Sequence, residues 1–353
     1  MKKRLLALGL SLAMSLTALV GCGGGGDTAS TSSSTQSAVA GSGDLSLTEP
    51  VNLNMAAAKM GTSWYSYGSI FSDILLQNLP SGSQITVETN SGATSNPLLI
   101  ENGSSQFGFG YNLSSAWALE GVEVYEGRAC PDLLGLVGNL DTFYYVIVTS
   151  AESGITDLAD VAANQTPIRV STTEVGNMGE VVSRLVLEEY GITYEDIEAW
   201  GGQVAHNDLT TIVDAFKDGQ TDLFIHNVTL GHASLTELAV TIDLNFLQMP
   251  QDMIDSMCEK YNFSTAVLPA GSFNGQDEDI NCLSLTTNLV ASSAMSDGVA
   301  YAITKALCEN TEALHAGHVA LEDFTPERAC DPAGLGIPLH PGAQAYFEEA
   351  GLM

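Results

Sequence analysis

The feature that most limits the fold is an alternation of strand-like and helix-like segments that begins near Leu45. Residues 51–55 predict a strand. The next segment carries apolar side chains at helical spacing, namely Tyr67, Ile70, Phe71, Ile74 and Leu75. Strands that alternate with helices of this length form right-handed βαβ units around a parallel sheet. The pattern therefore predicts an α/β fold with mainly parallel sheets and helices on both faces.

The alternation continues to the end of the chain. Pro80 and Gly82 end the first helix, and Asn96 is expected to cap the next one, with Pro97 at its first position. Further strands are expected at residues 85–87, 107–110, 144–148, 168–171 and 223–225, and a long strand after about residue 281. Two helical stretches finish the chain. Because the strand–helix pattern repeats in the second half, we expect two α/β lobes in series.

The N-terminus has the pattern of a bacterial secretion signal. A basic start at residues 2–4 precedes an apolar run over residues 5–20, which is too short to cross a membrane comfortably. The run ends in the letters LVGC, which resemble the lipobox after which the cysteine, here Cys22, carries lipid. An ordinary secretory signal with an incidental cysteine is the alternative. We expect a signal peptide over residues 1–21 and a flexible Gly/Ser/Thr tether over residues 22–45.

The charge of the chain is strongly acidic. The sequence holds 42 acidic and 11 basic residues, a net charge of −31. Loss of the signal peptide removes three basic residues and leaves about −34. Such a chain should repel nucleic acid and anionic membrane surfaces, so we expect no nucleic-acid partner and membrane contact only through the N-terminal lipid. A small anionic ligand stays compatible with this charge, because backbone dipoles can decide a local site.

Five cysteines follow Cys22 and bear on the redox state of the protein. They are Cys130, Cys258, Cys282, Cys308 and Cys330. Outside the cytoplasm they could form two disulfides with one thiol left over, and nearness in sequence suggests Cys258–Cys282 and Cys308–Cys330, with the connectivity open. No Cys-x-x-Cys or His-x-x-x-His motif occurs, so no metal or cofactor is expected.

The segment GTSWYSYG, residues 61–68, follows the first strand and opens the first helix. The first backbone N–H groups of a helix lack partners within it, and the macrodipole is positive there. Gly61 lets a ligand approach the backbone, and Thr62, Ser63 and Tyr65 add hydroxyl groups, which suits a small carboxylate. The alternative is that a serine merely caps the helix and that Trp64 is a core residue.

Similar polar loops follow other strands, where open α/β sheets bind ligands. The candidate ligand-binding residues in these loops are Asn90, Ser91, Thr94, Ser171, Thr172, Asn177, His226 and Asn227. For each loop taken alone, an ordinary polar turn or a structural histidine is the alternative. Four such loops across two lobes favour one shared crevice.

Catalysis is not expected. The six histidines lie in no recognisable nucleophile or metal motif. The acidic run at residues 275–281 lacks the spacing of a calcium loop and is interpreted as a solvated turn. A secreted α/β hydrolase that uses Ser63 or Ser66 is the enzymatic alternative, although the glycine spacing of a nucleophile elbow is missing.

The order of these motifs resembles that of TAXI-type solute-binding proteins of TRAP transporters. The resemblance covers about residues 47–352 and rests on segments such as GTSWYSYG, VETNSGATSNPLLIENGSSQFGF, VSTTEVGNMGEVVSRLVLEEYGI, DGQTDLFIHNVTLGHASLTELA and HPGAQAYFEEAGL. Three positions depart from the family pattern. Thr62 stands where the family usually has Gly, Ser66 stands where it has Pro, and Gly-Asn-Met-Gly-Glu at residues 176–180 replaces a Gly-Ser-Gly-Thr-Glu loop.

The resemblance implies a two-lobed periplasmic-binding-protein fold of type II with a hinge between the lobes. By the same analogy, residues 46–145 and about 290–353 would form lobe 1, and residues 146–289 would form lobe 2. Such a protein captures a solute, here a glutamate-like amino acid or a C4–C5 dicarboxylate, and delivers it to TRAP membrane permease subunits. The implied location is extracytoplasmic and lipid-anchored. A surface sensory or adhesive module of the same fold is a further alternative.

Basic residues are scarce around the proposed site. Only eight Lys or Arg follow the signal peptide, and none lies inside a proposed loop, although Lys59 and Arg169 flank two of them. We therefore expect carboxylate recognition by helix N-termini, hydroxyl groups and Asn side chains rather than by an arginine fork.

Overall fold

The computed structural model describes residues 45–353 except Gly61 and Ser91. The signal peptide, Cys22 and all of the tether but its last residue lie outside the described residues, as do the candidate ligand-binding residues Gly61 and Ser91. Within the described part of the chain, no helix is long and apolar enough to span a bilayer.

The first lobe contains a sheet with the strand order β2-β1-β3-β11-β4. β1 pairs in parallel with β2 and β3, as the alternating pattern predicts. The strands are β1 (Asn52–Ala56), β2 (Gln84–Glu88), β3 (Phe107–Tyr111), β4 (Leu133–Val137) and β11 (Ile280–Ser292), and the helices between them are α1 (Ser63–Asn78), α2 (Asn96–Glu101), α3 (Asn112–Glu120) and η1 (Glu123–Tyr125).

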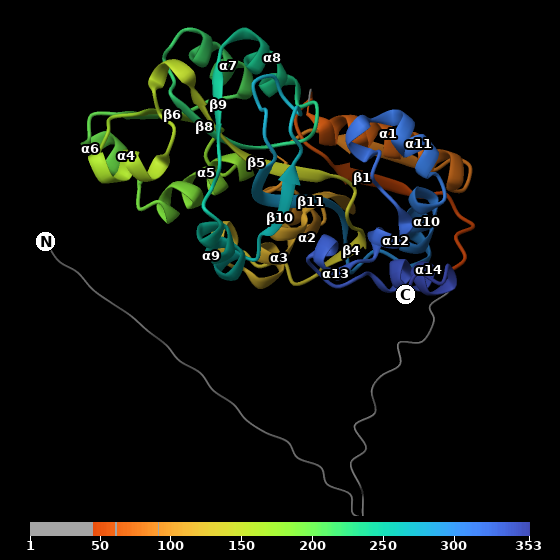
Figure 1. Ribbon diagram of the computed structural model, residues 1–353. Helices are drawn as coiled ribbons and strands as arrows, with labels where there is room; N and C mark the ends of the chain where they lie inside the picture. Colours follow the sequence, from red (N-terminus) through yellow and green to blue (C-terminus); the bar gives the residue numbers. More distant parts are fainter. Residues whose placement is uncertain (1–44, 61, 91) are drawn as a thin grey trace, which may run out of the picture. The chain divides into compact units, whose positions relative to one another are not determined.

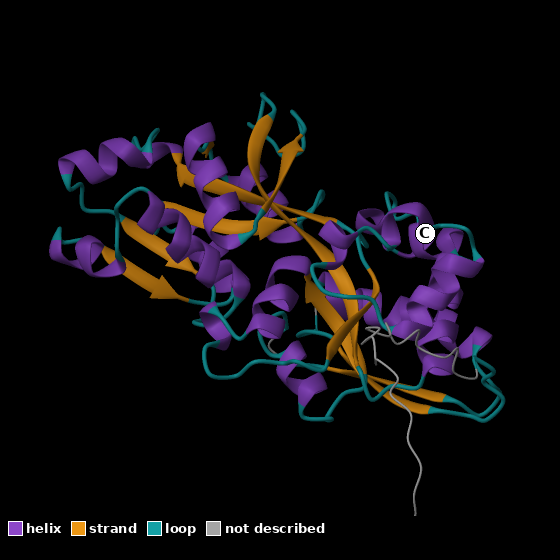
Figure 2. Cartoon of the chain, turned by 90° about the horizontal axis from the view of Figure 1, so that it is seen from below, coloured by secondary structure: helices purple, strands orange, loops and turns teal. Residues whose placement is uncertain are grey.

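The second lobe repeats this order as β7-β6-β8-β5-β9. Its parallel strands are β6 (Arg169–Thr172), β7 (Gln203–His206) and β8 (Leu223–Val228), and its antiparallel strands are β5 (Thr142–Ser150), β9 (Leu244–Leu247) and β10 (Ser264–Leu268). The helices are η2 (Ala151–Ser153), α4 (Leu158–Asn164), α5 (Met178–Glu189), α6 (Tyr194–Ala199), α7 (Leu209–Lys217), α8 (Ala233–Thr241) and α9 (Gln251–Tyr261). Figure 2 shows helices along both faces of the strands. This is the two-lobed α/β fold that the sequence predicts.

The expectation of mainly parallel sheets needs correction, because β5 and β11 pair antiparallel with each of their neighbours among the described strands. Ser284–Thr286 of β11 pair with β5 of the second lobe, and Thr287–Ala291 pair with β3 of the first lobe. One long strand thus serves both lobes. Side-chain periodicity does not reveal the direction of a strand, which depends on where the chain crosses between lobes.

The end of the chain returns to the first lobe. Figure 1 shows the blue helices α10 and α11 beside the orange helix α1. Ile70 of α1 lies so close to Gly317 that a Cβ atom there would meet its side chain at 2.8 Å. The terminal helices are α10 (Asp297–Cys308), α11 (Thr311–Gly317), η3 (Val319–Leu321), α12 (Pro326–Ala329), α13 (Pro332–Leu335) and α14 (Pro341–Glu349).

The suggested disulfides are not formed in the structure, where the five cysteines from Cys130 onward are free thiols. Cys282 lies inside β11 and its thiol faces the carbonyl of Ala266 at 3.6 Å. The thiol of Cys330 faces the carbonyl of Leu352 at 3.4 Å. Nearness in sequence was the only basis for the suggested pairs, and it does not fix which way a side chain points.

Asn96 has a different role from the predicted helix cap. Ser95 occupies the cap position, and Asn96 is the fully buried first residue of α2. Its amide nitrogen donates hydrogen bonds to the carbonyl oxygens of Ala57 (2.8 Å) and Phe109 (2.7 Å). The side chain therefore joins the residue that follows β1 to the middle of β3.

We predict that Asn96→Ala lowers the free energy of unfolding by about 3 kcal/mol, because it leaves buried strand carbonyls without a donor. The matched control is Asn102→Ala, whose exposed side chain only accepts a bond from the backbone of Ser104. That control should cost less than about 1 kcal/mol. Urea denaturation measures both values, and equal losses would contradict the assigned role of Asn96.

Candidate functional site

The N-terminus of α1 is held by Thr62, which is the helix cap. Its hydroxyl group donates to the carbonyl of Lys59 (2.7 Å) and accepts from the backbone N–H of Tyr65 (3.4 Å). Ser63 and Tyr65 are half-buried beside it. Trp64 is buried and its indole N–H donates to the hydroxyl of Thr287 (3.0 Å). At the N-terminus of α1, Ser63 and Tyr65 are therefore the side chains left for a ligand, because Thr62 and Trp64 form structural contacts.

The loop after β2 is ordered by Asn90. The side-chain oxygen of Asn90 accepts from the N–H of Gly92 (2.6 Å) and from the hydroxyl of Ser95 (3.0 Å). Its amide nitrogen is buried and has no hydrogen-bond partner among the described residues. Thr94, in the same loop, donates its hydroxyl proton to the carbonyl of Gly176 in the second lobe (2.5 Å).

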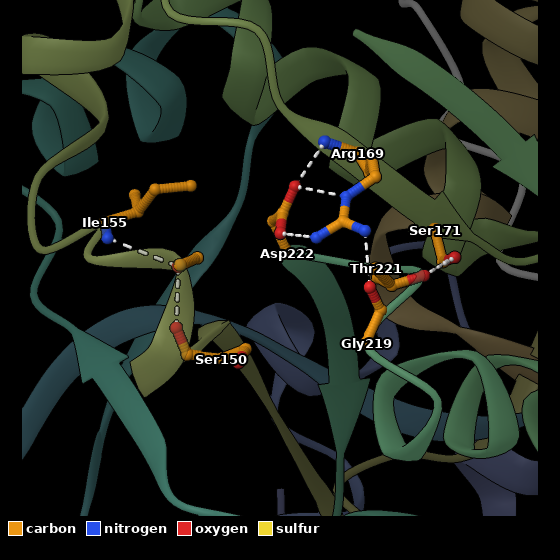
Figure 3. A network of polar contacts seen from close by, with 8 residues as sticks. Ser150, Ile155, Arg169, Ser171, Gly219, Thr221 and Asp222 are labelled. Carbon is orange, nitrogen blue, oxygen red and sulfur yellow. Dashed lines mark hydrogen bonds and ion pairs between the residues drawn. The ribbon is translucent and has the colours of Figure 1, made fainter.

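The loop after β6 leads into the N-terminus of α5. Asn177 is the cap, and its side-chain oxygen accepts from the N–H of Gly179 (2.9 Å). Thr172 is buried, and its hydroxyl has no partner within the described structure. Ser171 of β6 instead shares a hydrogen bond with Thr221 (2.6 Å), which precedes β8, as Figure 3 shows. Ser171 therefore contributes to the sheet rather than to an exposed loop surface.

His226 and Asn227 lie at the end of β8. His226 is 6% exposed and its ring stacks on Phe224 at a centroid distance of 5.0 Å. Burial, with a smaller effect from His232, holds the pKa of His226 well below its ordinary value. Burial lowers the pKa of His232 to about 4. Nδ1 of His226 has no partner in the described chain, so the ring offers a neutral, buried nitrogen.

Side-chain contacts between described residues join the two lobes at the carboxyl ends of their parallel strands. Lys59 pairs with Glu174 (2.6 Å), and Thr94 bonds to Gly176 as described above. The amide nitrogen of Asn227 donates to the hydroxyl of Tyr111 at the end of β3 (2.9 Å). The first two contacts link loops that follow first-lobe strands to the loop after β6, and the third links the last residue of β3 to β8. The structure therefore brings together the loops that contain Thr62, Asn90 and Asn177 and the end of β8 that contains Asn227.

The two flanking cations are already engaged. Asp222 accepts from the backbone N–H of Arg169 (2.8 Å) and binds its guanidinium group at 2.9 and 2.5 Å, and Gly219 accepts a further bond from that group. Figure 3 shows this clamp. Arg169 begins β6, at the opposite end of the strand from Thr172, so it lies away from the loop after β6. Lys59 lies at the rim in its pair with Glu174.

A separate hollow of about 580 Å³ lies on the second lobe. Its lining includes Ser150, Phe216, Lys217, Gly219 and Asn274. These residues lie at the amino-terminal side of the parallel strands, away from the four loops. Lys217 is already paired with Glu237 at 2.5 Å. We therefore place the candidate site at the loops and not in this hollow.

Sequence reasoning missed several residues that shape the site. Tyr111 and Glu174 contact the opposite lobe. Asp141, directly before β5, accepts a hydrogen bond from the backbone N–H of Thr287 in β11. Tyr111 is the last residue of the apolar strand β3, and its hydroxyl is the one polar side-chain group of that strand. This position in the sequence indicates a polar group at the carboxyl end of the strand. Asp141 and Thr287 carried no local signal, because their roles depend on the crossing of the two strands.

The chain is similar in sequence to one described family and in backbone to several solved structures. Residues 55–351 match the family described as NMT1-like. Among solved structures, similar ones include MatC from Rhodopseudomonas palustris with bound malate, at 12% identity over 86% of this chain and 96% of that chain with a TM-score of 0.47. PhnD1 from Prochlorococcus marinus in complex with methylphosphonate has 9% identity over 86% and 100%, with a TM-score of 0.49. The periplasmic aliphatic sulphonate binding protein SsuA from Escherichia coli has 14% identity over 85% and 84%, with a TM-score of 0.46.

We predict that the pKa of His226 lies well below its ordinary value, so that the ring is neutral at neutral pH, because burial penalises its charged form. Nitrogen-detected NMR of the imidazole, assigned with the His226→Gln variant, should show no titration as the pH passes through the ordinary histidine value. His318, which is half-buried and so more exposed than His226, serves as the internal comparison. A midpoint for His226 near the ordinary histidine value would contradict the assigned burial.

Proposed function

The chain belongs to the NMT1-like family, and on this premise we propose that it is the solute receptor of a TRAP-type secondary transporter. The two-lobed α/β fold supports this proposal. In the proposal, the cleft between the lobes captures a small carboxylate or amino acid, either glutamate-like or a C4–C5 dicarboxylate. The protein delivers this solute to the membrane permease subunits and catalyses no reaction.

The observation that carries the proposal is the meeting of polar loops from both lobes. In open α/β sheets, ligands bind beyond the carboxyl ends of parallel strands. Here the loops after β1 and β2 of the first lobe contact the loop after β6 of the second, through Lys59–Glu174 and Thr94–Gly176. A solute that touches both sides would favour the closed arrangement by its greater affinity for that state.

The chemistry of these loops suits a carboxylate without an arginine fork. Arg169 is clamped by Asp222, and Lys59 is paired with Glu174. The helices α1 and α5 both begin at the loops, where their first N–H groups and positive dipole ends attract an anion. The amide nitrogen of Asn90 and the hydroxyl of Thr172 are buried groups that can donate hydrogen bonds. Ser63, Tyr65, Asn177, His226 and Asn227 complete the proposed ligand-binding set.

The enzymatic alternative has little support. The hydroxyl of Ser66 donates to the carbonyl of Thr62 at 3.4 Å. Among the described residues, no histidine side chain forms a hydrogen bond with Ser63 or Ser66, which a serine nucleophile would need. A sensory or adhesive module of the same fold would use the same cleft, so the partner that receives the solute distinguishes it from a transport receptor.

Lipid anchoring at Cys22 is part of the proposal. We predict that Cys22→Ser releases the protein from the membrane fraction of expressing bacteria, because the variant cannot accept lipid. Immunoblots of membrane and released fractions measure this, with Cys130→Ser as the matched control. Unchanged membrane association of the Cys22→Ser variant would contradict the anchor.

We predict that at least one solute from a panel of small carboxylates and amino acids raises the melting temperature of the protein. Thr94→Val should then weaken its binding by about fivefold, because it removes the hydroxyl that bonds the second lobe. Calorimetric titration measures this change.

The matched control is Thr241→Val, which removes an exposed hydroxyl that bonds only Glu237 of its own helix. Its affinity should equal that of the parent protein. A panel in which no solute stabilises the protein would count against the proposed ligand class. Equal binding by the Thr94→Val variant would count against the site.

A further inference from the structure

The two lobes are joined at a crossing of β5 and β11. At Thr287, β11 changes its partner from β5 of the second lobe to β3 of the first. The backbone N–H of Leu140 donates to the carbonyl of Thr287 (3.0 Å), just before β5 begins. Asp141 lies between Leu140 and the first residue of β5. It is therefore at the junction about which the lobes would move.

Asp141 is a buried carboxylate at this junction, 3% exposed. Its Oδ1 accepts from the backbone N–H of Thr287 (3.1 Å), and its Oδ2 accepts from the hydroxyl of Tyr67 on α1 (2.8 Å). No lysine or arginine in the described part of the chain forms an ion pair with it. A buried carboxylate without a cation is costly to keep ionised.

The contacts of Asp141 continue to both sides of the cleft. Thr287 also accepts a hydrogen bond from Trp64, which is in the first turn of α1. Trp64 packs on Tyr111 at a ring distance of 4.6 Å, and the Tyr111 hydroxyl accepts from Asn227 of the second lobe (2.9 Å). A continuous set of side chains thus connects the junction to the N-terminus of α1 and to the end of β8.

The titratable groups that face this network are Asp141, three tyrosines and His318. Burial raises the pKa of Asp141 to about 6, against smaller lowering effects of hydrogen bonds from Thr287 and Tyr67. Burial also raises the pKa of Tyr67, Tyr111 and Tyr144, so these rings stay neutral. His318 packs edge-on against Tyr67 at 5.0 Å, and burial lowers its pKa.

We propose that Asp141 is a positioning residue for solute capture, whose protonation favours closure of the lobes. The inference rests on lobe closure in the proposed function. Parting of the lobes would separate Asn227 from Tyr111 and bring water toward Trp64 and Asp141, and water favours the ionised carboxyl group. The closed state therefore binds a proton more tightly than the open state, so acid favours closure.

The size of the effect follows from the pKa of about 6 in the closed state. If the open state restores an ordinary carboxyl pKa, the ratio of closed to open molecules rises about tenfold between about pH 8 and about pH 5. Asp141→Asn keeps a side chain of the same shape but cannot ionise. In that variant the ratio should be independent of pH and close to the acid value of the parent protein.

Small-angle X-ray scattering of the full chain without added solute tests this inference. The parent protein should have a smaller radius of gyration at about pH 5 than at about pH 8, and Asp141→Asn should remove the difference. The matched control is Asp73→Asn, which removes an exposed carboxylate from the same helix α1 and should behave like the parent. Unchanged pH dependence in Asp141→Asn would overturn the inference.

A second variant covers the case in which Asp141→Asn does not fold. Tyr67→Phe removes a hydrogen bond that favours the ionised carboxyl group, so it should shift the midpoint of compaction to higher pH. An unshifted midpoint would overturn the inference. The parent protein could also become more compact when a carboxylate from the panel is added but show no response to pH. That result would overturn the role of Asp141 and leave the proposed function standing. No compaction under either condition would overturn both.

Discussion

β11 forms hydrogen bonds with β5 over Ser284–Thr286 and with β3 over Thr287–Ala291, so a single strand determines where the two lobes meet. The apolar core depends on this crossing as well, because it joins side chains such as Phe109 of the first lobe and Ile225 of the second in one cluster. The parallel strands of each lobe end on the same side of the crossing, which is why their loops can contact each other. Weakening the crossing would separate the two halves of the site.

The loops of the two lobes that contact each other beyond the carboxyl ends of the parallel strands have few basic side chains that are not paired with an acid. Arg169 and Lys59 each have an acidic partner, in a chain whose net charge is −31. Recognition of an anion then relies on backbone N–H groups and neutral donors, whose strength depends on exclusion of water rather than on Coulomb attraction at a distance. Such a site is expected to gain affinity mainly in the closed state, where water is excluded from these donors.

Much of the fold could be predicted from the sequence, because periodicity and turn residues report on local structure. The strands near residues 51–55 and 107–110 and the helix of Tyr67, Phe71 and Leu75 lie close to where the pattern places them. The antiparallel direction of β5 and β11 could not be predicted, because it depends on pairing between distant segments. For the same reason the sequence predicts a helix cap at Asn96, whereas its amide joins β3 to the residue that follows β1.

The central claim is that one solute is held by loops of both lobes, and hydrogen exchange with mass spectrometry tests it most directly. The account predicts that a stabilising carboxylate slows amide exchange together in the loops around Thr62, Asn90, Asn177 and Asn227, since closure protects both sides of the cleft. Protection confined to one lobe, or to the hollow lined by Phe216 and Asn274, would contradict it.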